Sequence, residues 1–397
     1  MLRNPATLYT ALYVGQFLFL GVQLPFFPGW LEAQGITAGM IGLVMGGSLI
    51  LRLVLGPVVA WWAESQSDQR KALMAVAGMM AMSSILLLIP QPIWSICILT
   101  ILAIWAFGCL VPLSDTAVMR ADKAGQVNYG QSRGAGSLAF IVANLAGGVL
   151  IASHGDNVSV VWMAIAASLT LLVVVILPRR TVESSQDVEA GTIVRPHLSE
   201  AMRLFRSRSF ILMLIAVGLT QGTHAAYYYF SELHWSALGY RSDLIGILWT
   251  LGVLAEIIVL YKGRSFIRRL GPVAMISIGA FGAIIRWPLT GLSPPLPVLV
   301  GLQLLHALTF AMTYLGSVEF IARAVPSGLS NTSMTIVSTL GVGALTGLAA
   351  IFVGFVFTAE APLPAYLLMG GMGAVGFIAS LLLSRRWNGG LINTARS

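Results

Sequence analysis

Residues 93–119 read IWSICILTILAIWAFGCLVPLSDTAVM and contain a single charged residue, Asp115. A transmembrane helix needs about 20 consecutive apolar residues, so this stretch is long enough to cross a bilayer. Similar apolar stretches precede and follow it, at residues 7–30, 39–62, 72–90, 127–153, 158–177, 209–231, 243–262, 271–290, 296–322, 332–357 and 363–384. We therefore expect an all-α membrane protein with twelve transmembrane helices.

The composition of the whole chain supports this class. Of the 397 residues, 57% are hydrophobic and 10% are charged, and the mean hydropathy is +0.85. A soluble domain carries about 25% charged residues, so an ordinary soluble enzyme and a disordered protein are both excluded. Twelve crossings joined by short loops leave no room for a large soluble domain.

The twelve stretches fall into two sets of six. The residues between the sets are rich in Arg, Asp and Glu, which predicts a polar linker. We accordingly expect an N-terminal six-helix half at residues 1–178, a cytoplasmic linker at 179–208 and a C-terminal six-helix half at 209–397.

An internal repeat supports two related halves. An offset of 204 residues places Arg52 of the second apolar stretch opposite Glu256 of the eighth. The same offset places Asp115 of the fourth stretch opposite Glu319 of the tenth. Parallel repeats related by an axis along the membrane normal are an architecture of transporters.

The positions of the basic residues predict the orientation. With both termini in the cytoplasm, nineteen of the 23 Lys and Arg residues fall on the cytoplasmic side and only Arg241 lies in a loop on the other. Cytoplasmic loops are enriched in Lys and Arg, so this orientation accounts for the net charge of +8 without a nucleic-acid partner. We expect a multi-pass protein of a bacterial-type inner membrane with both termini cytoplasmic.

Ionisable residues within the apolar stretches are the first candidates for function. A charge at the centre of a transmembrane helix costs about 2.5–3.5 kcal/mol on insertion scales, so such residues indicate a polar cavity. The alternative is an internal ion pair that fixes helix packing. The candidates are Arg52, Asp115, Arg133, His224, Glu256, Arg286, His306 and Glu319.

Two stretches carry polar residues at helical spacing, which places those residues on one face of each helix. Two such faces with a histidine on each favour proton handling. The seventh stretch contributes Gln221, His224, Tyr227, Tyr228 and Ser231, and the tenth contributes Gln303, His306, Phe310 and Thr313.

Several segments, almost from end to end of the chain, resemble the major facilitator superfamily, and within it the phenylpropionic acid (hydrocinnamate) permease group, which is related to lactose permease and the nucleoside–proton symporters. They include Leu24-Pro25-Phe26, Val111-Pro112-Leu113-Ser114-Asp115, Gly222 to Tyr228 (GTHAAYY) and Arg286-Trp287. The resemblance implies alternating access, with helices one, four, seven and ten lining a midplane cavity. A degenerate form of the superfamily's loop signature, with Glu64 and Arg70-Lys71, follows the second helix.

Lactose permease has an acidic residue and an arginine spaced like Asp115 and Arg133, and an arginine and a histidine spaced like Arg286 and His306. The resemblance implies substrate binding by the first pair, to which we add Gln221, Tyr227 and Tyr228. It implies proton coupling by the second, to which we add His224 and Glu256. Thr309 and Gln303 stand where that permease has its coupling glutamate and a lysine, so Glu256 or His224 must supply the replacement. Support of the cavity is expected from Arg52, Gln303 and Glu319.

The resulting expectation is a secondary active transporter, with protons driving symport of a small organic acid such as phenylpropionate. The alternatives are a proton-coupled sugar or nucleoside symporter and an efflux antiporter. The sequence contains no HExxH, Walker or paired CxxC motif, which disfavours a membrane-embedded enzyme, and a receptor is the remaining different class. We expect no cofactor and no metal, a monomer in the lipid bilayer, and only the substrate and protons as partners.

Overall fold

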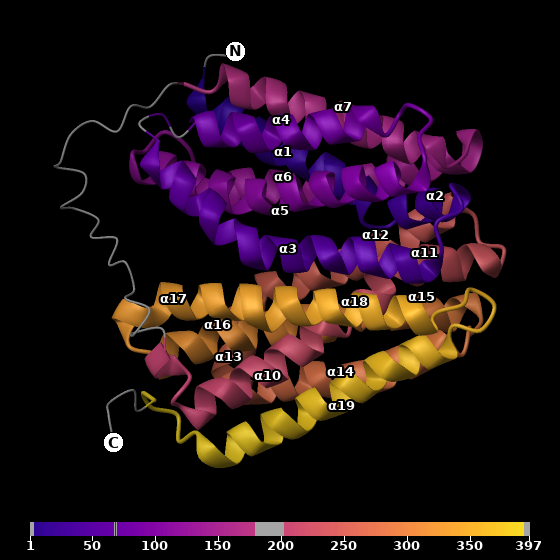
Figure 1. The fold of residues 1–397 in the computed structure, drawn as a ribbon. Helices are drawn as coiled ribbons and strands as arrows, with labels where there is room; N and C mark the ends of the chain where they lie inside the picture. The colour runs from indigo at the N-terminus through magenta and orange to yellow at the C-terminus, as the bar shows by residue number, and fades with distance from the viewer. Residues whose placement is uncertain (1–3, 67, 69, 179–201, 393–397) are drawn as a thin grey trace. The chain divides into compact units, whose positions relative to one another are not determined.

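The computed structural model describes residues 4–66, 68, 70–178 and 202–392, and these residues form helices joined by short loops (Figure 1). Eleven of the described helices are long and apolar enough to cross a membrane. The third predicted stretch corresponds to α4 (Arg70–Leu86), which has 17 residues. The prediction of an all-α membrane protein is confirmed.

The chain divides into two compact units. Unit 1 comprises residues 1–184 and 228–250, and unit 2 comprises residues 185–227 and 251–397. Residues 228–250 therefore pack with N-terminal helices, although they lie in the second predicted half. The division into two six-helix halves stays a prediction, and most of its linker, residues 179–201, lies outside the described residues.

Unit 1 is a bundle in which α1 packs against α6 and α7, α4 packs against α5 and α7, and α3 packs against α5. Asn4, Thr37 and Asn128 accept hydrogen bonds from the first turns of α1, α3 and α6, as N-cap side chains do. The helices are α1 (Pro5–Gln23), α2 (Phe27–Ala33), α3 (Ala38–Ser65), α4, α5 (Ile93–Lys123), α6 (Tyr129–His154), α7 (Asn157–Ile176), most of α11 (Ala225–Ala237) and the first part of α12 (Ser242–Tyr261).

Unit 2 is built around α14, which packs against α19 and α16, while α10 packs against α19 and η3. Besides the remainder of α11 and α12, it contains α10 (Arg208–Gly222), α13 (Gly263–Leu270), α14 (Pro272–Gly291), α15 (Leu296–Leu304), η1 (Ala307–Met312), α16 (Thr313–Ala324), η2 (Ser327–Leu329), α17 (Ser330–Ile336), η3 (Val337–Ala344), α18 (Leu345–Val356) and α19 (Leu363–Arg386).

Three of the predicted helices are interrupted. The seventh breaks at Thr223 and His224, between α10 and α11. The tenth and eleventh contain the π-helical segments η1 and η3. Such interruptions free backbone groups and occur often at functional sites, and two of these three lie beside the predicted histidines.

Candidate functional site

A cluster of aromatic and charged side chains lies in unit 1, where α1, α5 and α6 meet. Asp115 of α5 accepts a hydrogen bond from the Tyr13 hydroxyl at 2.5 Å and another from the Tyr129 hydroxyl at 3.4 Å. The Tyr13 and Tyr129 rings meet edge to face with centroids 6.3 Å apart. Two phenols therefore engage the carboxylate that was predicted to contact substrate.

Arg133 of α6 belongs to the same cluster but lies on aromatic rings. The central carbon of its guanidinium is 4.3 Å from the Phe17 ring centroid and 5.8 Å from that of Tyr13. Among the described residues no ion pair joins it to a carboxylate within 4.0 Å. The predicted pair Asp115 and Arg133 is thus brought into one cluster without forming a salt bridge.

Hydrogen bonds between helices hold this cluster in place. Gln16 of α1 donates to the Ser114 hydroxyl at 2.7 Å, directly beside Asp115 in the chain. The Thr10 and Ser132 hydroxyls are 2.8 Å apart, beside Arg133. These bonds tie α1 to both α5 and α6, so the positions of the acid and the arginine depend on α1.

Sequence reasoning did not identify Tyr13, Phe17 and Tyr129 as site residues. Tyr13 and Phe17 are four residues apart on α1 and so share a helix face. That spacing was the available signal, but it is also the spacing of ordinary core residues. Only the packing of α1 on α6 distinguishes a site residue from a core residue at these positions.

The remaining predicted residues of unit 1 and the predicted Glu319 lie elsewhere. The Arg52 side chain of α3 lies against Gly108 of α5, whose added Cβ would be 2.8 Å from Arg52 Cδ. Tyr228 stacks on Trp249 with centroids 6.0 Å apart. In unit 2, Glu319 pairs with Arg323 at 2.5 Å on the same helix, and this pair is separate from the hydrogen bonds around Arg286.

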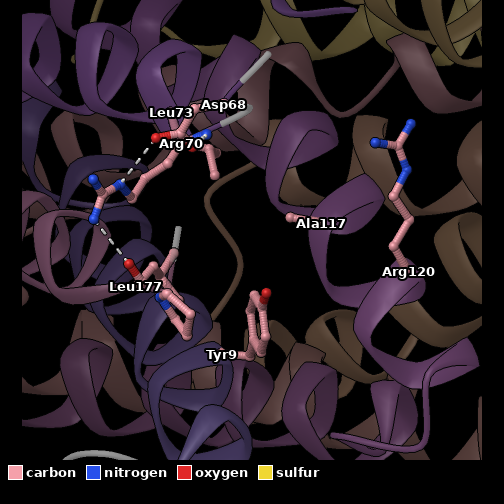
Figure 2. A pocket seen from close by; sticks show the side chains of 8 residues that line it. Tyr9, Asp68, Arg70, Leu73, Ala117, Arg120 and Leu177 are labelled. Carbon is pink, nitrogen blue, oxygen red and sulfur yellow. Dashed lines mark hydrogen bonds and ion pairs between the residues drawn. The ribbon is translucent and has the colours of Figure 1, made fainter. Parts of the chain in front are cut away.

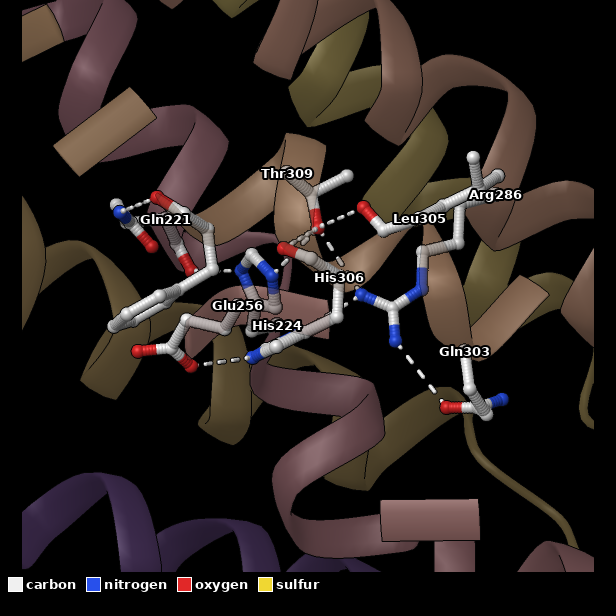
Figure 3. Close-up of polar contacts among 9 residues, drawn as sticks. Gln221, His224, Glu256, Arg286, Gln303, Leu305, His306 and Thr309 are labelled. Atoms are coloured by element: carbon white, nitrogen blue, oxygen red, sulfur yellow. Dashed lines mark hydrogen bonds and ion pairs between the residues drawn. The ribbon is translucent and has the colours of Figure 1, made fainter. Parts of the chain in front are cut away.

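A second polar network lies in unit 2 and contains the predicted coupling residues (Figure 3). Arg286 of α14 is fully buried, and it donates to His306 Nδ1 and to the Thr309 hydroxyl, each at 3.1 Å. His306 Nε2 faces Glu256 Oε2 at 3.5 Å. Thr309 also contacts His224 Nε2 at 3.0 Å. The structure brings His224, Glu256, Arg286 and His306 into one network.

The hydrogen-bond directions follow from the chemistry of arginine. A guanidinium only donates, so His306 Nδ1 accepts and its hydrogen lies on Nε2, facing Glu256. The carbonyl of Gln221 is 3.0 Å from His224 Nδ1, which therefore donates, leaving His224 Nε2 to accept from Thr309. The contacts therefore run from the Arg286 guanidinium through His306 to the Glu256 carboxylate.

Neutral side chains complete the environment of Arg286. Gln303 accepts from its Nη2 at 3.3 Å, and its guanidinium carbon lies 4.3 Å from the Trp287 ring centroid and 4.9 Å from that of Tyr227. Tyr227 is buried, so it packs within the network. Thr309 and Gln303, the two departures from lactose permease, both act as acceptors for Arg286.

The helix interruptions position the histidines. His224 lies between α10 and α11, and His306 directly precedes the π-helical η1. The imidazole centroids are 5.2 Å apart and the rings are nearly perpendicular. The Gln221 side chain donates to the Phe310 carbonyl within η1 at 3.2 Å, so a polar side chain near one interruption satisfies a backbone group in the other.

A pocket in unit 1 involves the loop that follows α3 (Figure 2). Arg70 donates to the carbonyls of Val175 and Leu177 at 3.1 and 3.0 Å, where the last carbonyls of α7 lack helical partners. Asp68 accepts from the Arg70 backbone amide at 3.0 Å. The degenerate loop signature thus contributes a helix-end contact inside unit 1.

Comparison with known proteins gives consistent results. Residues 7–368 match the profile of the MFS_1 like family. The chain is 28% identical over 345 residues to the "Probable 3-phenylpropionic acid transporter" of Escherichia coli, covering 87% of this chain and 89% of that protein. It is 24% identical over 384 residues to the maltose permease of Geobacillus stearothermophilus, covering 96% and 95%.

A solved structure with a similar fold is that of the nucleoside transporter NupG, with a TM-score of 0.76, 15% sequence identity and coverage of 97% of this chain and 100% of that chain. At this identity the likeness concerns the fold alone. The predicted fold, twelve transmembrane helices in the major facilitator arrangement, is confirmed.

Proposed function

This chain belongs to the MFS_1 like family and is a membrane transporter, and from that premise we propose that it couples protons to the uptake of a small organic acid such as phenylpropionate. The observation that carries the proposal is Arg133, a guanidinium that lies on the Phe17 ring without a carboxylate partner among the described residues. The binding residues we propose are Arg133, Asp115, Tyr13, Phe17 and Tyr129.

The chemistry of this cluster suits an aromatic carboxylate. Arginine binds carboxylates by two parallel charge-assisted hydrogen bonds, and the neighbouring aromatic rings can pack against a phenyl group. Because phenols already hold the Asp115 carboxylate, the Arg133 guanidinium is available to bind the substrate. The name of the Escherichia coli relative, which refers to 3-phenylpropionic acid, agrees with this substrate class.

For proton coupling we propose Glu256, with His306, Arg286 and His224 as its partners. Glu256 ends the chain of donors, and its side chain is 20% exposed, so water can deliver a proton to it. Protonation removes the negative charge that faces His306 and offsets the buried Arg286. The described arrangement of unit 2 is then less stable, which shifts the population toward a different one.

A sugar or nucleoside symporter is the second candidate. The Tyr13, Asp115 and Tyr129 group offers hydroxyl donors and a carboxylate acceptor, which also suit a polyhydroxyl cargo. The maltose permease relative agrees with this alternative. The two candidates differ in what Arg133 must recognise, because only an acid supplies a negative charge.

The test is substrate-induced alkalinisation of the medium by de-energised cells that produce the protein. Phenylpropionate, its neutral amide, maltose and uridine are added in turn, and cells with an empty vector correct for passive entry of the acid. We expect alkalinisation with phenylpropionate alone. Alkalinisation with maltose or uridine and none with the acid would contradict the proposed substrate class.

Two variants connect the result to the site. Glu256→Gln should abolish alkalinisation while leaving substrate binding measurable. Arg241→Gln is a matched control, because Arg241 is 69% exposed and pairs with Asp243 outside the cluster. Further parts of the proposal are both termini in the cytoplasm, a bacterial-type inner membrane and a monomeric state.

A further inference from the structure

Glu232 of α11 is a buried carboxylate outside both polar clusters described above. Glu232 is 7% exposed. Oε1 accepts a hydrogen bond from the Ser236 hydroxyl at 3.1 Å, whereas Oε2 is buried and has no hydrogen-bond partner. Since burying an ionised carboxylate is costly unless it is paired, this group requires an explanation.

The carboxyl group lies against the backbone of α2 in unit 1. A Cβ added to Gly29 would be 2.1 Å from Oε2 and 2.7 Å from Oε1, so only glycine leaves room for the carboxyl there. In the same region Trp30 Nε1 donates to the Asn157 side chain at the start of α7 at 2.9 Å. The orientation proposed above places this end of unit 1 outside the cell.

The charged groups around Glu232 do not offset a negative charge. The nearby groups that interact with it electrostatically are the acids Glu32 of α2 and Asp156 before α7. Arg241, at the start of α12, pairs with Asp243 at 3.3 Å. His234, two residues further along α11, is itself buried, and among the described residues no Lys, Arg or His forms an ion pair with Glu232.

We propose that Glu232 is a second proton-binding site, occupied while α11 packs on Gly29 of α2 and emptied when this contact opens. A neutral carboxyl with one unsatisfied oxygen costs far less to bury than an anion with the same defect. Two neighbouring acids further disfavour the anion. The proton thus permits the close approach of α11 to α2.

The proposal has a defined pH dependence. If the packed state holds one proton that the open state releases, raising the pH favours opening. Between the titrations of the two states the equilibrium shifts by about tenfold per pH unit for one proton. This inference requires neither the proposed cargo nor a coupling role of Glu256, so it can fail or succeed independently of the proposed function.

The first experiment observes the proton directly. Infrared spectra of the purified protein with its native cysteines are compared between the wild type and Glu232→Gln at neutral pH. We expect the wild type to show a carbonyl stretch of a protonated carboxylic acid that the variant lacks. Glu32→Gln is the matched control, because Glu32 is an exposed acid in the same region and its removal should leave the band in place. Identical bands in the wild type and Glu232→Gln would overturn the proposal.

The second experiment measures opening. Leu233 of α11, next to Glu232, is 2% exposed, so a Leu233→Cys variant without Cys97 and Cys109 should react with a membrane-impermeant maleimide only when the packing around α11 opens. Labelling is corrected for the pH dependence of the thiolate with an exposed reference cysteine. The corrected rate should rise with pH by up to about tenfold per unit, and Glu232→Gln should abolish this rise. A rise that persists in Glu232→Gln would contradict the inference.

Discussion

Replacing Arg133 by Gln tests the proposed substrate site most directly, because the structure allows its effect to be estimated. Among the described residues Arg133 has no carboxylate within 4.0 Å, so substrate binding breaks no internal ion pair. Each hydrogen bond to a charged group contributes about 1.5–3 kcal/mol. Loss of the two bonds of a bidentate contact therefore costs about 3–6 kcal/mol, which is about 100-fold to 10,000-fold in affinity at 1.4 kcal/mol per tenfold.

The assay is the initial rate of labelled phenylpropionate uptake into proteoliposomes over a range of concentrations. Arg133→Gln should raise the half-saturation concentration by at least about 100-fold. Arg133→Lys keeps the charge but loses the planar fork and should give an intermediate value, while the control Arg241→Gln should match the wild type. Arg133→Gln protein that is folded and has the wild-type half-saturation concentration would refute the reasoning.

Three further predictions concern coupling and stability. Glu256→Gln should retain counterflow exchange but lose concentrative uptake. For symport of one proton with one monoanion, the wild type should reach an accumulation ratio of about tenfold per unit of pH gradient. Accumulation by the variant would remove Glu256 from coupling. Thr309→Val should reduce the free energy of unfolding in detergent by about 1–3 kcal/mol for each buried polar group left unpaired, which lowers the thermal midpoint. Thr309→Ser should keep the wild-type midpoint, and equal midpoints for both variants would show that the hydroxyl is dispensable. Gly21→Ala should also lower the midpoint, because its Cβ would lie 2.6 Å from that of Ala143 and overpacking costs about 1–3 kcal/mol of unfolding free energy. Gly47→Ala, which meets no atom within 4 Å, should leave the midpoint unlowered, and equal losses from both glycine variants would contradict the packing argument.

Local sequence located the ionisable residues within the apolar stretches, but it did not identify their partners. The resemblance to lactose permease implied a pair of Asp115 and Arg133, yet Asp115 bonds to Tyr13 and Tyr129. The repeat places Glu319 opposite Asp115, but Glu319 pairs with Arg323 on its own helix. Partner choice depends on which helices are neighbours, and neither residue spacing nor the repeat encodes that directly.

The coupling network illustrates what helix periodicity can and cannot predict. Periodicity placed His224 and His306 on polar faces, and the structure puts their rings 5.2 Å apart. It did not predict the interruption at His224 or the π-helical segment after His306, because a break in a helix does not change the spacing of the residues on either side of it. Helix periodicity also did not single out Glu232 as a functional residue, because the burial of Glu232 depends on the close approach of Gly29.

By itself the sequence determined that this protein spans a membrane as helices and which ionisable groups lie within it. The physical reason is local: a long apolar run must satisfy its backbone hydrogen bonds internally in lipid, and a charge within such a run is costly. Only the tertiary structure decided that phenols rather than Arg133 hold Asp115, that the donors leading through His306 end at Glu256, and that Glu232 is buried against Gly29. These contacts join residues far apart in the chain, so they depend on the packing of whole helices.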